Sequence, residues 1–169
     1  MIKFGESYQR IMRQIHKDLY TEGDTKQKQI AIILKLVIDC CFRIGNDKYT
    51  KENQSYGVST LQSNHVTVNG SQINIKFRGK KGVSNACTLK NKKLSKMLRT
   101  KKRSIGKDHR LFTYRHKNRY FEVRSTDVNK YLKKFGNFTA KNFRTWGANL
   151  EFIQQLIKMD KEKTQILTV

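Results

Sequence analysis

Apolar residues recur at helical spacing in the first part of the chain. Residues 6–19 are predicted to form a helix with one apolar face, which carries Ile11, Met12, Ile15 and Leu19. A second helix is expected to start after Thr25, whose hydroxyl can cap its first turn. Its apolar series is Ile30, Ile33, Leu34, Val37 and Cys41. These two predicted helices lead the chain to Arg43.

From Tyr56 onward the apolar residues alternate with polar ones, a pattern typical of strands. The alternation passes through residues 58–61 and 65–68 and continues at Ile73, Ile75 and Phe77. Asn69-Gly70 favours a tight hairpin between them, because both central positions of such a turn need positive φ. A further strand is expected over residues 83–89. The pattern therefore predicts a small antiparallel sheet of about three strands, in which His65 faces solvent or DNA.

Helical spacing returns after residue 90, with Leu94, Met97 and Leu98 on one face. The polar, basic residues 100–107 are predicted to form a loop. Two more helices are expected over residues 123–135 and 140–159. The length suits one domain with its own core. The predicted fold class is therefore α+β: a mainly helical domain with one small antiparallel sheet.

The charge of the chain narrows the choice of partner. The 169 residues include 36 Lys and Arg against 13 Asp and Glu, a formal net charge of +23. Such a surface repels itself unless a polyanion shares it, so nucleic acid is the expected partner. An anionic membrane or an acidic protein would also suit a basic surface. However, the most apolar stretch, residues 30–38, is interrupted by Lys35 and too short for a span. We therefore expect no membrane partner.

The three cysteines, Cys40, Cys41 and Cys87, form no C-x-x-C pair and are odd in number. We therefore expect neither a disulfide framework nor a zinc site. Cys40 and Cys41 fall in the apolar part of a predicted helix and are interpreted as small buried thiols. Together with an N-terminus that lacks the pattern of a signal peptide, this favours a reducing, intracellular compartment.

Three cations stand out as candidates for chemistry on a phosphodiester. Arg43 is followed by Ile44-Gly45, a pair that permits close approach of a ligand. Lys80 lies in a Gly-Lys-Lys-Gly turn, where a mobile lysine can donate a proton to a leaving oxygen. Arg144 lies near the start of a predicted helix. Arginine suits the nonbridging oxygens of a phosphate in its transition state, because it is always charged and binds two oxygens at once.

Each of these residues also has a simpler interpretation. Arg43 could complement the dipole at the end of a helix. Lys80 could be a solvated loop residue. Arg144 could stack on the ring of Trp146 or pair with Glu151. The individual signals are weak, so their joint occurrence in this order matters more than any one of them.

The local sequences around the three cations resemble the catalytic core of type IB DNA topoisomerases, closest to the small poxvirus-like branch. The matching segments are Cys41-Phe42-Arg43-Ile44-Gly45-Asn46, Ile75-Lys76-Phe77-Arg78-Gly79-Lys80 and Thr139-Ala140-Lys141-Asn142-Phe143-Arg144-Thr145-Trp146-Gly147. The resemblance implies the catalytic fold that this family shares with tyrosine recombinases. It also implies that Arg43, Lys80 and Arg144 are catalytic, activating the scissile phosphate and expelling the 5′ oxygen. Lys141 and Asn149 are implied as supporting DNA contacts.

The implied activity is relaxation of supercoiled double-stranded DNA by a monomer, through tyrosine attack and a transient 3′-phosphotyrosyl link. No cofactor is implied: no ATP and no obligatory metal. The implied location is the nucleus or a viral factory, or otherwise the cytoplasm. With about 8 phosphates neutralised, log affinity is expected to fall with log salt at a slope of roughly −7.

In the family, the nucleophilic tyrosine lies well downstream of the second arginine and follows a histidine. The residues after Arg144 contain neither type. We therefore expect residues 1–169 to be a catalytic core that is incomplete at the C-terminus, with the family's N-terminal domain absent. Two alternatives stay open: a non-catalytic DNA-binding remnant, and a tyrosine recombinase. The recombinase is disfavoured by Lys141, because recombinases usually place His at that position.

Overall fold

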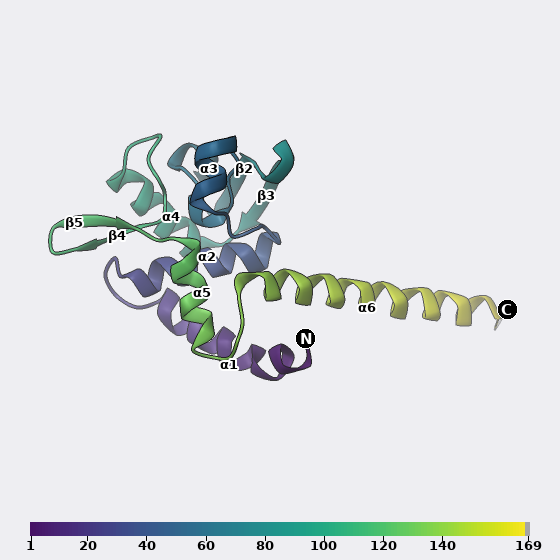
Figure 1. Cartoon of the computed structure of the whole chain (residues 1–169). Coiled ribbons are helices and arrows are strands. Elements are labelled where there is room, and N and C mark those ends of the chain that lie inside the picture. The colour runs from purple at the N-terminus through teal and green to yellow at the C-terminus, as the bar shows by residue number, and fades with distance from the viewer. Residues whose placement is uncertain (168–169) are drawn as a thin grey trace.

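The computed structural model describes the backbone of residues 1–167 and the side chains of residues 1–159. Its helices are α1 (Ile2–Leu19), α2 (Lys26–Cys40), α3 (Asp47–Asn53), α4 (Lys92–Ser104), α5 (Ser125–Lys133) and α6 (Ala140–Leu167). Its strands are β1 (Val66–Asn69), β2 (Gln72–Arg78), β3 (Ser84–Lys90), β4 (Thr113–His116) and β5 (Arg119–Glu122). Figure 1 shows α1 and α2 on one side of the body, α3 with β2 and β3 on the other, and α6 extending away from both. The α+β prediction is confirmed.

The two N-terminal helices form as the apolar pattern predicts, although α1 already begins at Ile2. The Thr25 hydroxyl accepts a hydrogen bond from the Lys28 backbone N–H at 3.2 Å and so caps α2. Cys41 ends α2 in the left-handed conformation, with φ of 52°. α2 is buried on most of its surface, as expected for the central helix of a small domain; its buried apolar residues are Ile30, Ala31, Ile32, Ile33, Leu34, Leu36 and Val37.

The main sheet is antiparallel, in the order β1-β2-β3. Its buried face carries Val66, Ile73, Ile75 and Phe77. The hairpin turn differs from the prediction: Asn69 pairs with Gln72, so the two turn residues are Gly70 and Ser71. Only Gly70 of these two has positive φ, at 56°. A positive φ at the first central position is the pattern of a type II′ turn, in which glycine stands first.

The predicted strand over residues 58–61 is wrong, because Val58–Thr60 forms a 3-10 turn. His65 also lies outside the sheet, at the end of a second 3-10 turn, Ser63–His65. Its half-buried ring meets the Tyr56 ring at 4.5 Å between centroids, and burial lowers the pKa of His65. His65 is therefore a packed residue, and the prediction that it faces solvent or DNA from a strand is corrected.

The second half of the chain holds two further differences from the predictions. α4 continues through Ser104, so the loop predicted over residues 100–107 begins five residues too early. β4 and β5 pair in a separate antiparallel hairpin that the apolar pattern did not indicate. Every residue of β5 is exposed, so the strand carries no buried alternation from which it could be predicted. Its turn residues, Lys117 and Asn118, both have positive φ without a glycine.

The cysteine prediction is wrong in two respects. Cys40 at the end of α2 and Cys87 in β3 form a disulfide, with 5.8 Å between their Cα atoms. Cys41, expected to be buried, is exposed and free. The pairing depends on the sheet folding back against α2, and a separation of 47 residues gives no sign of that approach. Three cysteines are therefore compatible with one disulfide bond and one free thiol.

In the part of α6 whose side chains the structure describes, residues 140–159, the contacts with the body lie at the beginning of the helix. The Trp146 ring stacks on the Tyr8 ring of α1 at 5.8 Å, and the Phe143 ring meets Phe4 edge-on at 5.1 Å. Farther along, the described part of the helix leaves the body and exposes large apolar side chains: Leu150, Phe152, Ile153, Leu156, Ile157 and Met159. The anchored first turns are the part of α6 that carries Lys141 and Arg144. Among the described residues, no helix combines the length and apolar composition that crossing a membrane requires.

Candidate functional site

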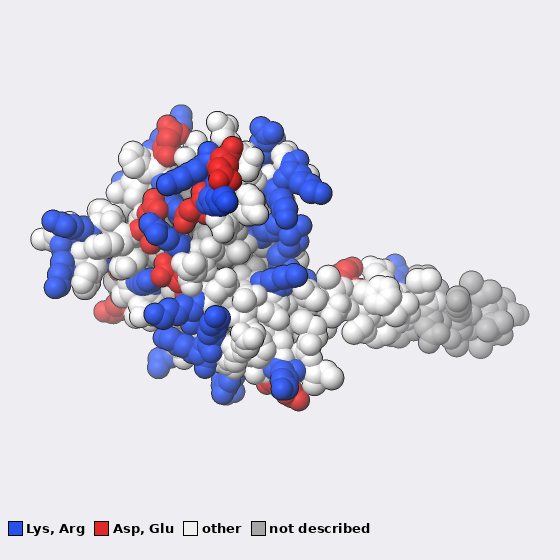
Figure 2. All heavy atoms as spheres, viewed as in Figure 1, with Lys and Arg blue, Asp and Glu red and all other residues white. Residues whose placement is uncertain are grey.

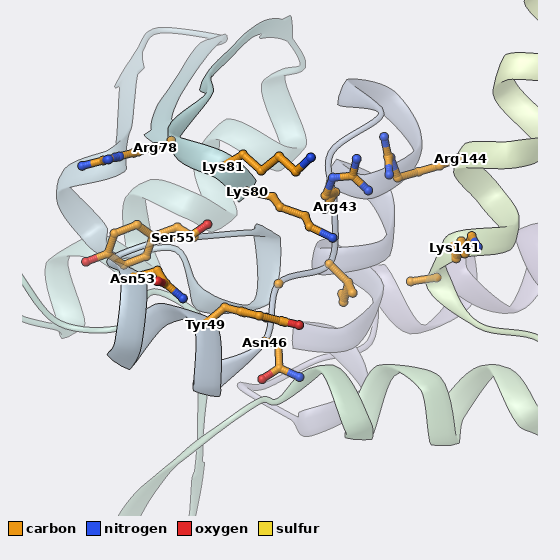
Figure 3. Close-up of a pocket in the computed structure, with 15 residues that line it drawn as sticks. Arg43, Asn46, Tyr49, Asn53, Ser55, Arg78, Lys80, Lys81, Lys141 and Arg144 are labelled. Atoms are coloured by element: carbon orange, nitrogen blue, oxygen red, sulfur yellow. The ribbon is translucent and has the colours of Figure 1, made fainter.

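A cavity of about 610 Å³ opens between the end of α2, α3, the β2–β3 turn and the start of α6. It brings together four of the five predicted site residues: Arg43, Lys80, Lys141 and Arg144. The fifth, Asn149, is exposed farther along α6 and does not line the cavity. Figure 3 shows Lys80 and Lys81 reaching toward Arg43 from one side and Arg144 reaching toward it from the other.

The backbone around Arg43 is fixed by the loop at residues 57–59. The Val58 N–H donates to the Arg43 carbonyl oxygen at 2.9 Å, and the Ser59 N–H donates to the Ile44 carbonyl oxygen at 2.7 Å. The two backbone segments can approach this closely because each has a glycine at the contact. Gly45 has φ of 89°, which favours glycine, and it lies against the backbone of Gly57. Arg43 is thus held on a loop with little freedom to shift.

The ring of Phe42 ties this loop to the sheet. Phe42 is buried and meets the ring of Phe77 in β2 edge-on, with 4.9 Å between centroids. The disulfide between Cys40 and Cys87 adds a covalent link between the same two parts of the fold. Because Phe77 lies three residues before Lys80, these contacts set where the lysine turn stands relative to Arg43.

The β2–β3 connection is a short turn with Lys80 at its start. The Gly79 N–H donates to the Val83 carbonyl oxygen at 2.8 Å, and the Gly82 N–H donates to the Gly79 carbonyl oxygen at 3.0 Å. Lys81 has φ of 60°, so the chain reverses sharply there. Lys80 and Lys81 are exposed at the tip, free to meet a ligand, whereas Arg78 points away from Arg43 (Figure 3).

Arg144 is positioned by a backbone contact across the cavity wall. Its Nε donates to the Cys41 carbonyl oxygen at 2.8 Å, next to the loop that carries Arg43. Partial burial and then the nearby positive charge of Arg43 lower the pKa of Arg144. The Trp146 ring packs against the rings of Tyr8 and Phe4. The geometry therefore favours the phosphate-binding interpretation over a structural pairing with Trp146.

The charge of the cavity is entirely positive. Its lining includes six cations, namely Arg43, Arg78, Lys80, Lys81, Lys141 and Arg144, and none of the described lining residues is Asp or Glu. Two of the three guanidinium groups, those of Arg43 and Arg144, lie beside the lysine ammonium groups. This arrangement suits a divalent or polymeric phosphate anion. Within the described part of the chain, no group of three or more His, Cys, Asp or Glu could hold a metal ion.

α3 provides a wall of the cavity that the sequence pattern did not predict. Asn46, Tyr49 and Asn53 line the cavity from this short helix and its N-cap. The Asn46 side chain accepts from the Lys48 N–H at 2.8 Å, and Asp47 forms an ion pair with Arg110. The Asn46-Asp47 pair was a usable start signal for a helix. α3 buries none of its residues, so no apolar period supported that signal.

Comparisons with known proteins identify relatives of this chain. The sequence model of the eukaryotic DNA topoisomerase I catalytic core matches residues 1–168. DNA topoisomerase 1B of Acanthamoeba polyphaga mimivirus is 33% identical over 168 residues, which cover 95% of this chain and 49% of that protein. DNA topoisomerase I of Monkeypox virus is 28% identical over 145 residues, covering 85% of this chain and 43% of that protein. The chain therefore spans about half the length of these relatives.

A solved structure shares the fold at low sequence identity. The XerH site-specific recombinase bound to difH substrate superimposes with a TM-score of 0.51 and 16% identity, over 82% of this chain and 39% of that one. This likeness concerns the fold alone. The family model, by contrast, matches nearly the whole chain, including the residues that line the cavity. The chain belongs to the family of the eukaryotic DNA topoisomerase I catalytic core.

Proposed function

We propose that this chain is the phosphate-binding part of a type IB DNA topoisomerase, which relaxes supercoiled duplex DNA by breaking and resealing one strand. One observation carries the proposal: Arg43, Lys80 and Arg144 meet at a single cavity whose charged lining is wholly cationic. The relatives named DNA topoisomerase 1B support the same activity.

In this proposal, each cation has a separate role at the scissile phosphate. Arg43 and Arg144 bind the nonbridging oxygens, where negative charge concentrates in the transition state. The tyrosine hydroxyl loses its proton to water and its oxygen attacks phosphorus. The bond from phosphorus to the 5′ oxygen breaks, and Lys80 gives a proton to that oxygen. The product is a 3′-phosphotyrosyl link and a free 5′ hydroxyl. The reverse steps reseal the strand and return the proton to Lys80.

Two further residues are proposed to hold the DNA. Lys141 lies one helical turn before Arg144 on α6 and would contact a neighbouring phosphate. Asn149 lies farther along the same helix, outside the cavity, and would contact the duplex beyond the scissile position. We propose that one molecule acts on one duplex, in the nucleus, a viral factory or the cytoplasm, wherever its DNA is found.

The proposal needs a nucleophilic tyrosine, whereas its main alternative, a DNA-binding remnant, does not. Residues 145–169 include no Tyr and no His. The second candidate function is a DNA-binding remnant that has lost covalent chemistry. Two tyrosines do line the cavity, Tyr49 on α3 and Tyr56 before the sheet. They are the candidates within residues 1–169; a tyrosine beyond residue 169 or on a second polypeptide is the other source. The recombinase alternative is disfavoured, because Lys141 stands where recombinases usually have His.

The proposal is tested by relaxation of supercoiled plasmid in EDTA without ATP. We expect Arg144→Ala to slow relaxation at least about 100-fold, the usual loss when one group that stabilises a transition-state anion is removed. Lys133→Ala on the exposed side of α5 removes the same charge away from the cavity and should relax DNA normally. If the wild-type chain relaxes DNA, Tyr49→Phe and Tyr56→Phe then show whether either residue supplies the nucleophile.

Other outcomes bear on both candidates. Salt-sensitive DNA binding without any relaxation, and without a covalent protein–DNA adduct, would mean that residues 1–169 bind DNA but do not supply the nucleophile, which either lies beyond residue 169 or has been lost. Relaxation that is equally fast in Arg144→Ala and Lys133→Ala would overturn the roles given to the cavity. An absence of DNA binding at low salt would overturn both candidates.

A further inference from the structure

A second cavity, of about 660 Å³, lies at the opposite end of α2 from the phosphate-binding cavity. It is formed by the loop before α2, the first turns of α2, α4 and the β4–β5 hairpin, and it shares no residue with the first cavity. α2 has 15 residues, so the two cavities are roughly 22 Å apart along its axis. Figure 1 shows the β4–β5 hairpin near the start of α2 and α6 near its end.

Three polar side chains of this second cavity, two of them buried, are joined by hydrogen bonds. Asp24 accepts from the Gln29 Nε2 at 2.6 Å and from the Lys101 Nζ at 2.8 Å. Both donors belong to buried residues: Gln29 is 4% exposed and Lys101 is 6% exposed. These contacts fix the Gln29 amide, because its nitrogen must face the carboxylate.

The remaining atom of that amide has no partner. Gln29 Oε1 is buried and accepts no hydrogen bond within the described structure. A buried acceptor without a donor costs about 1–3 kcal/mol, so natural proteins rarely keep one without a reason. Gln29 lines the cavity, but its Oε1 is covered from solvent. A ligand N–H group can therefore satisfy this oxygen only when the side chains that cover it shift.

The rim of the cavity combines cations with aromatic rings. The cavity as a whole is lined by five cations, Lys28, Lys93, Lys96, Lys101 and Arg115, and one carboxylate, Asp24, a net charge of +4. Lys101 is buried and paired with Asp24, so the other four cations are the ones without that partner. The Lys93 Nζ stands 4.6 Å from the centre of the Tyr20 ring, and the Lys101 Nζ stands 5.6 Å from the centre of the Tyr120 ring. Both tyrosines are exposed, at 38% and 53%. The rim therefore offers flat surfaces for stacking beside positive charges for phosphate.

We propose that this second cavity binds a nucleotide, either free or as an unpaired residue of a nucleic-acid strand. The base stacks on Tyr20 or Tyr120, as bases do on aromatic side chains. An amino group of the base donates to Gln29 Oε1. The phosphates bind Lys93, Lys96 and Arg115. No bond is made or broken at this site, so it acts in addition to the proposed strand cleavage and does not depend on it.

The test is a calorimetric titration of the protein with ATP, at low salt and in EDTA. To remove phosphate binding at the first cavity, the background is the double variant Arg43→Ala/Arg144→Ala. We expect it to bind ATP with an affinity within about 2-fold of the wild-type chain. Adding Tyr20→Ala and Lys96→Gln, both at exposed positions, should weaken ATP binding at least about 10-fold. Lys130→Gln/Lys133→Gln on α5 is the charge control and should have little effect.

Three further measurements identify the ligand chemistry. Inorganic tripolyphosphate carries the charge without a base and should bind at least about 10-fold more weakly than ATP. A 12-residue oligo(dA) that displaces ATP at a lower concentration than free AMP would identify a strand as the source, and the opposite order would identify the free nucleotide. Gln29→Leu, checked for an unchanged melting temperature, should weaken ATP more than tripolyphosphate. If the Gln29→Leu variant does not fold, the effect of Tyr20→Ala with Lys96→Gln on ATP binding still tests the proposal.

The proposal is overturned by any of three results. One is ATP binding that disappears in Arg43→Ala/Arg144→Ala, which would place the nucleotide in the first cavity. Another is equal binding of ATP and tripolyphosphate, which would indicate charge alone. The third is equal weakening by Tyr20→Ala with Lys96→Gln and by the α5 charge control.

Discussion

At the scale of single residues, Gly57 holds Arg43 in place although it carries no side chain. A Cβ at this position would lie 2.7 Å from the Arg43 carbonyl oxygen and closer still to the Gly45 backbone. Gly57→Ala must therefore push the two backbone segments apart. We expect a loss of about 1–3 kcal/mol in the free energy of unfolding, the usual cost of overpacking, and weaker DNA binding because Arg43 shifts. Urea denaturation and a DNA-binding titration measure the two effects.

Gly70 provides the control for this change. A Cβ at Gly70 meets nothing within 4 Å, but its φ of 56° disfavours other residues. Gly70→Ala should therefore cost about 1–2 kcal/mol and leave DNA affinity unchanged. Equal DNA affinity in Gly57→Ala and Gly70→Ala would contradict the role given to Gly57.

At the scale of elements, the disulfide between Cys40 and Cys87 joins the end of α2 to β3. It closes a loop of 47 residues, and a loop of that length restricts the unfolded chain by up to about 4 kcal/mol. We expect Cys87→Ser to lower the free energy of unfolding by about 2–4 kcal/mol under oxidising conditions. Cys41→Ser, at the exposed free thiol, should change it by less than about 0.5 kcal/mol. Urea denaturation with and without a dithiol reductant measures both, and a wild-type stability that the reductant does not alter would contradict the prediction.

The elements also show which parts of the fold the sequence could predict. α1, α2 and the three-stranded sheet bury one face or more, so their apolar period is visible before the structure is known. α3 and the β4–β5 hairpin bury little, and their place depends on contacts such as the ion pair between Asp47 and Arg110. Arg43, Lys80 and Arg144 were predicted from the local sequences around them. Tyr49 was missed as a lining residue of the cavity, because α3 has no apolar period that predicts it. The disulfide was missed because it depends on the approach of two distant elements.

Across the whole molecule, the net charge of +23 is unevenly distributed, and this distribution decides where DNA should bind. Figure 2 shows Lys and Arg spread over the visible face of the body, whereas the described part of α6 beyond the body is mainly uncharged. DNA should therefore bind along the body, around the cavity at the end of α2. Each phosphate contact releases counterions from the DNA, so binding should weaken steeply as salt is raised.

The salt dependence of DNA binding should follow the number of phosphates that the protein neutralises. With about 8 phosphates neutralised, log affinity should fall with log salt at a slope of roughly −7. Lys141→Gln removes a cation at the cavity and should reduce the slope by about 1, because one phosphate contact is lost. Lys133→Gln removes the same charge from α5, away from the cavity, and should leave the slope unchanged. Affinities measured by fluorescence anisotropy between 50 and 200 mM salt give the three slopes. A nearly flat dependence would mean that contacts other than phosphate binding dominate, and equal effects of the two variants would mean that DNA follows the overall charge and not the cavity.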